Sequence, residues 1–273
     1  MKDFRYLIQH FFTHSDFLPP AAELPGTLFT PLHFVFEAVV LAIVIGSAIY
    51  VARRKWLIKP VFTRLWIVLL ALEVAIITWD TVCSAAPGFD WNTNLSLYPC
   101  SIFMYTLPFY IWGKSLWKRA ASGYICTLGL LGALINFGYP VARLMQYSCI
   151  SFAAFHTFIF HGSMLFVCLV LLMSGEHRYT GVTRWWEMFL ASVPGLLVSI
   201  PANLINYSPL HADYMYFTGQ HFIVANILGN IGPHKTTLAM YLVYLLVPAF
   251  FYLPGWLAVK LEEHRPRLRL GMD

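Results

Sequence analysis

Hydrophobic residues in this chain gather into long continuous runs, which short polar or basic connections separate. Each run is close to the roughly 20 residues that an α-helix needs to cross about 30 Å of hydrocarbon. The pattern therefore predicts an all-α membrane protein, a bundle of seven transmembrane helices. The expected helices cover about 31–52, 61–82, 94–113, 120–140, 147–173, 185–206 and 236–259.

The rest of the sequence supplies two flanking segments and one long connection. Residues 1–30 form an amphipathic lead that we expect outside the membrane, and they lack the apolar core of a cleaved signal peptide. Residues 260–273 form a basic tail. The connection 207–235 is moderately hydrophobic, which predicts an external cap or a re-entrant segment. We therefore expect one transmembrane domain over 1–273, with the helix bundle at 31–259.

The charged residues exclude an ordinary soluble domain and suggest an orientation. Only 11% of the residues are charged, against roughly 25% in soluble proteins. Fourteen of the 18 Lys and Arg lie in alternate connections and in the C-terminal tail. Because such residues concentrate on the cytoplasmic side, the N-terminus is predicted outside and the C-terminus in the cytoplasm. The net charge of +5 then indicates contact with anionic lipid and not with nucleic acid.

Five cysteines are present, and none forms a CxxC pattern, so no metal site, disulfide framework or cofactor is predicted. Most of them fall within apolar runs, where a thiol commonly packs as a small hydrophobe. Cys100 differs because it follows Pro99 near the start of a run, and a proline there frees backbone groups beside the thiol. Cys100 is therefore a candidate nucleophile, and a packing role is the alternative.

Ionisable side chains within the apolar runs are costly to bury and usually face a cavity or a partner. Glu37 and Glu73 lie in the first two runs, and His156 and His161 lie in the fifth. Five residues along a helix give about 140° of rotation, so the two rings cannot face one point without a kink. We expect one histidine to be functional and the other supporting, with Glu73 near one of them. Structural hydrogen bonds between helices are the alternative.

Two asparagines end the sixth run on its external side. Asn203 and Asn206 are three residues apart and share a helix face, after Pro194 and Pro201 have loosened the helix. We regard both as supporting or substrate-binding candidates. Polar residues from runs two, three, five and six thus gather between the external side and the membrane centre, which predicts a site that opens to the outer leaflet.

These residue types fit acyl transfer. A thiol can attack a carbonyl, a histidine can take its proton, and a carboxylate can orient and stabilise the imidazolium. An apolar setting makes a thiol inert, so Cys100 requires a neighbouring base.

Several short motifs carry a resemblance to a known family. They are Leu95–Cys100 (LSLYPC), Phe155–His161 (FHTFIFH), Leu72–Glu73, Ile231–Pro233 and Tyr252–Pro254. In their order and spacing the sequence resembles the YwaF-like family of bacterial integral membrane proteins and, more distantly, the transmembrane ether-phospholipid acyltransferases. The resemblance implies that Cys100 takes the acyl group and that His161 is its base.

The leading hypothesis is an enzyme of a bacterial plasma membrane that moves a fatty acyl group to a lysolipid through a Cys100 thioester. Membrane lipids would be its substrates. One alternative is a lipid hydrolase that uses the same residues with water as the acceptor. The other is a non-catalytic lipid or small-molecule transporter in which Glu73, His156 and His161 bind substrate or protons. The sequence shows no internal repeat, which argues against a transporter built from duplicated halves.

Overall fold

The computed structural model of the protein is helical, and its described residues contain no β-strand. The structure describes residues 2–20, 23–92, 94–138, 146–180, 184–210, 212–220, 224–225, 228–229 and 231–264. The α-helices are α1 (Lys2–Gln9), α2 (Pro31–Ala52), α3 (Ile58–Cys83), α4 (Ile102–Trp112), α5 (Ser115–Tyr124), α6 (Leu130–Gly138), α7 (Phe152–Ser174), α8 (Val193–Asn206) and α10 (Pro233–His264). Short turns of other helix types are η1 (Ser15–Phe17), η3 (Lys55–Leu57), η4 (Ile125–Gly129), η6 (Trp185–Ser192) and η7 (Tyr214–Tyr216).

Six helical stretches of the described chain are long and apolar enough to cross a membrane. They correspond to six of the seven expected runs and confirm these as helical. The expected helix 147–173 begins only at Phe152, after the N-cap Ser151, and residues 139–140 of the expected helix 120–140 lie outside the described chain. The stretches are Pro31–Ala52, Lys55–Cys83, Ser115–Gly138, Phe152–Ser174, Trp185–Asn206 and Pro233–Leu261. The protein is therefore an α-helical integral membrane protein.

The expected third helix, 94–113, is only partly helical. Its helix α4 has 11 residues, Ile102–Trp112, and spans about 16 Å, which is too short to cross the hydrocarbon by itself. Pro99 has no N–H and disfavours the helical conformation at Tyr98, so the chain enters α4 through a turn. The count of seven long helices is thus replaced by six long helices and one short apolar helix within the described residues.

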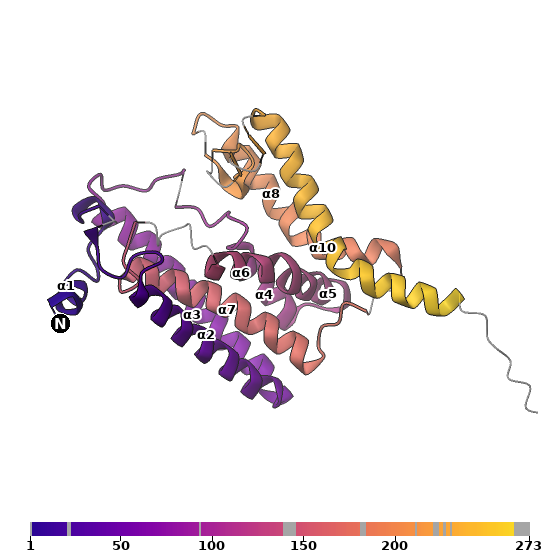
Figure 1. The fold of residues 1–273 in the computed structure, drawn as a ribbon. Helices are drawn as coiled ribbons and strands as arrows, with labels where there is room; N and C mark the ends of the chain where they lie inside the picture. The colour runs from indigo at the N-terminus through magenta and orange to yellow at the C-terminus, as the bar shows by residue number, and fades with distance from the viewer. Residues whose placement is uncertain are drawn as a thin grey trace, which may run out of the picture.

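The helices form two neighbouring groups (Figure 1). Helix α7 packs on α2, α3 and α6, and α4 packs between α3 and α5. Helices α8 and α10, with η6, lie beside α5 and η4 on the other side. Where α2 and α7 meet, Gly162 permits the close approach, because a Cβ there would lie 3.3 Å from a methyl group of Val44.

The N-terminal segment is bound to the ends of two long helices. The Trp79 indole on α3 donates to the Phe12 carbonyl at 2.8 Å, and the Phe152 N–H on α7 donates to the Phe11 carbonyl at 2.8 Å. The Ser15 N–H donates to the Tyr147 hydroxyl at 2.9 Å. The predicted amphipathic lead therefore packs against the bundle over its described residues.

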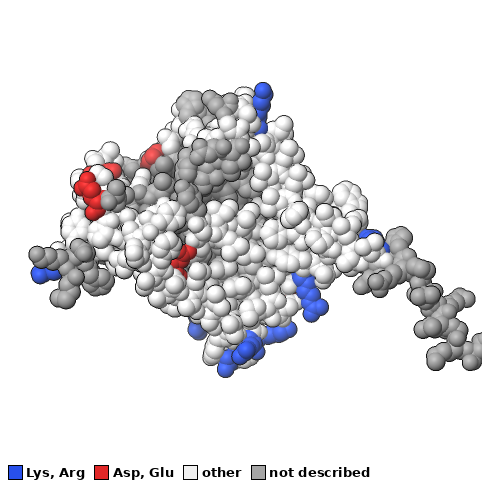
Figure 2. Space-filling view, viewed as in Figure 1, with Lys and Arg blue, Asp and Glu red and all other residues white. Residues whose placement is uncertain are grey.

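Charge is distributed unevenly over the surface. Figure 2 shows most of the Lys and Arg along the lower edge and right of the view, and Asp and Glu mainly at the upper left. The two ends of the bundle therefore differ chemically, as the sequence indicates, and which end faces the cytoplasm stays a prediction. Of the predicted basic tail 260–273, residues 265–273 lie outside the described part of the chain.

Candidate active site

A cavity of about 300 Å³ lies where the segment before α4 meets α3 and α7. Four of the predicted site residues line it: Cys100, His161, Glu73 and His156. We call it the thiol cavity. The helix α7 lines it from His156 to His161, more than one turn, so both histidines reach one cavity although they cannot face one point.

Cys100 lies in the turn that begins α4. Its carbonyl accepts from the Phe103 N–H at 3.1 Å, and Ser101 accepts in the same way from Met104 at 3.0 Å. The thiol thus stands at the N-terminal end of α4, where the positive end of the helix dipole favours a negative charge. The thiol still requires a neighbouring base, because it packs against the hydrophobic core.

Helix α6 leaves room for the sulfur atom. A Cβ placed on Gly132 would lie 3.5 Å from the Cys100 Sγ and 3.5 Å from the Met164 side chain, so a glycine hydrogen faces the thiol. The π-helical turn η4 precedes α6 in the chain. Tyr124, the residue just before η4, donates from its hydroxyl to the Pro99 carbonyl at 2.6 Å. Short π-helical turns often occur at functional sites. Here η4 directly follows α5, whose Tyr124 holds Pro99 in place.

The tautomer of His161 follows from its hydrogen bond. The Nδ1 atom lies 2.9 Å from the Thr157 carbonyl, which can only accept, so Nδ1 carries the proton. Nε2 then carries a lone pair and can act as a base. Among the described residues no hydrogen bond joins His161 to Cys100, so proton transfer requires a side-chain movement or a bridging water.

Glu73 and His156 form the pair that the sequence predicts. The His156 Nε2 lies 3.0 Å from one carboxylate oxygen of Glu73, and the two side chains are only 13% and 14% exposed. The Ser96 hydroxyl donates to the other carboxylate oxygen. Glu73 on α3 therefore ties α7 to the segment that leads to Cys100, and the expectation that it approaches a histidine is confirmed.

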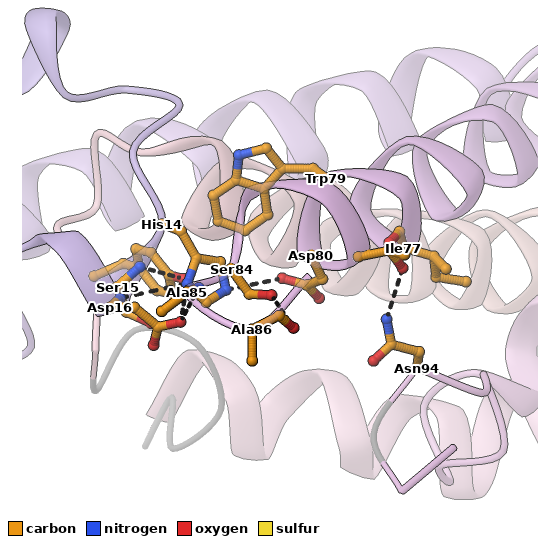
Figure 3. Close-up of polar contacts among 12 residues, drawn as sticks. His14, Ser15, Asp16, Ile77, Trp79, Asp80, Ser84, Ala85, Ala86 and Asn94 are labelled. Atoms are coloured by element: carbon orange, nitrogen blue, oxygen red, sulfur yellow. Dashed lines mark hydrogen bonds and ion pairs between the residues drawn. The ribbon is translucent and has the colours of Figure 1, made fainter. Parts of the chain in front are cut away.

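The N-terminal segment lies beside Asp80 (Figure 3), and Asp80 also lines the thiol cavity. His14 lies between two carboxylates, 3.1 Å from Asp16 and 3.7 Å from Asp80. Asn94, also in the lining, donates to the Thr81 hydroxyl at 3.3 Å. Asp80 was not among the predicted site residues, although it follows Glu73 by seven residues, nearly two helical turns, and so shares its helix face.

The two asparagines lie outside the lining of the thiol cavity. Asn206 exchanges two hydrogen bonds with the backbone of Tyr214, at 2.7 and 2.8 Å. The Tyr214 hydroxyl accepts from the Leu95 N–H at 3.0 Å, and its ring lies 5.2 Å from that of Tyr98. Asn206 thus supports the segment before Cys100. Asn203 donates to the Tyr241 hydroxyl at 2.5 Å and belongs to the α8–α10 contact.

Helices and cavity together define a polytopic membrane protein with a polar cavity inside its helical bundle. Within the described ranges, no group of three or more His, Cys, Asp or Glu side chains is arranged to hold a metal ion. The model of the TMEM164 family matches residues 28–258, which include the whole thiol cavity, and the chain belongs to this family of transmembrane proteins. Comparison with curated proteins and with solved structures gives no match.

Proposed function

We propose that the protein is a membrane-embedded lipid acyltransferase that moves a fatty acyl group to a lysolipid through a thioester on Cys100. The observation that supports this best is the shared cavity: Cys100 at the start of α4 and His161 on α7 line it together. The proposed relation to the YwaF-like proteins and to the ether-phospholipid acyltransferases agrees with this chemistry.

In the first half-reaction, the Nε2 atom of His161 takes the thiol proton. The Cys100 thiolate attacks the ester carbonyl of the donor lipid, and the positive end of the α4 helix dipole stabilises the resulting oxyanion. The intermediate expels the alkoxide of the lysolipid, which takes the proton from His161. The acyl group is then bound to sulfur as a thioester.

In the second half-reaction, the hydroxyl of the acceptor lysolipid gives its proton to His161 and attacks the thioester. The thiolate leaves and regains the proton, so the enzyme returns to its starting state. The Glu73–His156 pair and Ser96 hold the reacting segment against α7. Exclusion of water from the cavity favours transfer over hydrolysis.

We also propose how the protein is oriented in the membrane and which membrane it occupies. The irregular segment before α4 and α4 itself together make a seventh crossing, with the N-terminus outside, the C-terminus in the cytoplasm and the thiol cavity open to the outer leaflet. The membrane is a bacterial plasma membrane, and membrane lipids are donor and acceptor.

The test compares variants of the purified protein with a defined donor phospholipid and a lysolipid acceptor. Wild type should gain the mass of one acyl chain and produce remodelled lipid, and Cys100→Ala should do neither. His161→Gln should form the thioester slower by about 10²–10⁴, the usual value of a general base. Cys168→Ala, which removes a buried thiol of α7 outside the thiol cavity, is the matched control.

The same assay separates the alternatives. Free fatty acid without remodelled lipid would indicate a hydrolase. Unchanged cellular function of Cys100→Ala would indicate a transporter, in which the buried Glu73–His156 pair binds the cargo or a proton. Full transfer activity of Cys100→Ala would overturn the thioester.

A further inference from the structure

A second cavity, of about 250 Å³, lies beyond the other end of α7. It is lined by α5, by the loop 175–178, by η6 and by Tyr252 of α10, and we call it the loop cavity. Gly175 follows His161 by 14 residues, about 21 Å along the helix axis. The two cavities share no lining residue, so the loop cavity is separate from the proposed acyl transfer.

A chain of hydrogen bonds forms one wall of the loop cavity. The Ser122 hydroxyl donates to the Arg119 carbonyl at 3.1 Å, so its oxygen accepts from His177 Nδ1 at 3.3 Å. The His177 Nε2 then accepts from the Tyr252 hydroxyl at 3.1 Å. Burial lowers the pKa of His177 to about 4, so the ring is neutral at pH 7. This wall is therefore fixed and uncharged.

The charges at the rim are partly paired. Arg119 forms an ion pair with Glu187 at 3.0 Å, and Lys118 lies 3.5 Å from Glu176. Arg178 also lines the cavity, and no ion pair joins it to another residue of the described chain. Both carboxylates of the lining, Glu176 and Glu187, thus have a cationic partner. The guanidinium of Arg178 forms no ion pair among the described residues. The cavity consequently has one positive charge available for an anion.

The position of the loop cavity fits a lipid headgroup. Its loop follows the apolar helix α7 directly, and η6 begins with the exposed Trp185 and Trp186. Tryptophans of this kind concentrate at the membrane–water boundary. Guanidinium groups bind phosphate by bidentate, charge-assisted hydrogen bonds. We propose that the loop cavity binds the phosphate of a phospholipid headgroup through Arg178.

The test is native mass spectrometry of the delipidated protein in detergent. Phosphatidylethanolamine is added, and diacylglycerol with the same acyl chains serves as the phosphate-free probe. Wild type should bind the phospholipid in preference to diacylglycerol, and Arg178→Gln should bind it about tenfold more weakly, as expected for the loss of one charge-assisted contact. Arg53→Gln, which removes an exposed arginine at the end of α2, should bind like wild type.

Further arms make the result unambiguous. Arg178 is exposed, so Arg178→Gln should fold normally. The thermal midpoint of this variant is measured beside its binding. Cys100→Ala should keep the adduct, which separates this site from the acyl transfer. Equal binding by Arg178→Gln and wild type would overturn the proposal. So would Arg178-dependent binding of inorganic phosphate as tight as that of the phospholipid, because the ligand would then be a soluble anion.

Discussion

At the scale of the residue, three histidines near the two cavities are each held by specific partners. His161 is fixed by the carbonyl one turn before it, His156 by Glu73, and His177 by the hydroxyls of Ser122 and Tyr252. Two of these histidines line the thiol cavity, while His177 lies beyond the end of α7. Of these three histidines, only His177 can change the stability of the fold on protonation without taking part in the proposed acyl transfer.

Acid should destabilise the fold through His177. Burial lowers its pKa from 6.5 to about 4, so the unfolded chain binds a proton below pH 6.5 that the folded chain does not bind until about pH 4. Stability is therefore full above pH 6.5 and is lost as the pH falls toward 4. The linkage relation gives about 2 kcal/mol between pH 7.5 and pH 5.

The measurement is the thermal midpoint in detergent at these two pH values. His177→Gln should be less stable than wild type at pH 7.5, because it loses hydrogen bonds to Ser122 and Tyr252, yet it should lose less stability on acidification. The charged neighbours Arg119, Arg178, Glu176 and Glu187 are present in both proteins. An equal loss in both would exclude His177 as the cause.

Sequence reasoning reached the residues that are chemically unusual in an apolar run. Glu73, His156 and His161 stand out there, and the Glu73–His156 contact follows from the cost of an unpaired carboxylate. It missed Ser96 and Tyr214, because polar residues in connections are common and carry no periodic signal. Their partners lie 23 and 119 positions away in the chain, and only the folded structure brings them together.

At the scale of the element, α4 and its preceding turn decide where the thiol lies. Hydropathy alone predicts an apolar segment at 94–113 but cannot separate a helix from an irregular apolar segment. Pro99 was the available signal, and the structure places the helix start three residues after it. The six long helices were predictable because their apolar runs match the length that a membrane requires.

A larger side chain at position 132 should disable the thiol without unfolding the bundle. An alanine Cβ there has ordinary contact distances of 3.5 Å to the Cys100 Sγ, whereas the branched methyls of Gly132→Val would press on the sulfur. Gly132→Ala should therefore form the thioester normally. Gly132→Val should form it about 10²-fold more slowly, the usual cost of a displacement near 1 Å.

The control is Gly46→Val on α2, where an added Cβ meets nothing within 4 Å. Thioester formation is followed by intact mass, and the thermal midpoint reports the strain of overpacking, typically 1–3 kcal/mol. Normal acylation of a folded Gly132→Val would contradict the placement of the thiol against α6.

At the scale of the whole molecule, the number of crossings decides on which sides the two termini lie. Six crossings would place both on one side of the membrane, whereas a seventh through the segment before α4 places them on opposite sides. The distribution of Lys and Arg favours opposite sides, with the C-terminus in the cytoplasm.

Reporter fusions at the two ends test this directly. A reporter that is active only in the cytoplasm should work after residue 273 and fail before residue 1, and a reporter that is active only outside should do the reverse. Both termini on the same side would mean that α4 enters and leaves by one face, and the outer-leaflet opening of the thiol cavity would then need revision. A fusion inside the connection 53–57, expected in the cytoplasm, is the internal control.

The attachment of the N-terminal segment also has a consequence for biosynthesis. The hydrogen bond from Ser15 to Tyr147 joins residues 132 positions apart. At about 5–20 residues per second, a ribosome needs roughly 7–26 s to make the intervening chain. This contact of the N-terminal segment therefore forms only after the chain has been made to Tyr147, and until then Ser15 is accessible to proteases.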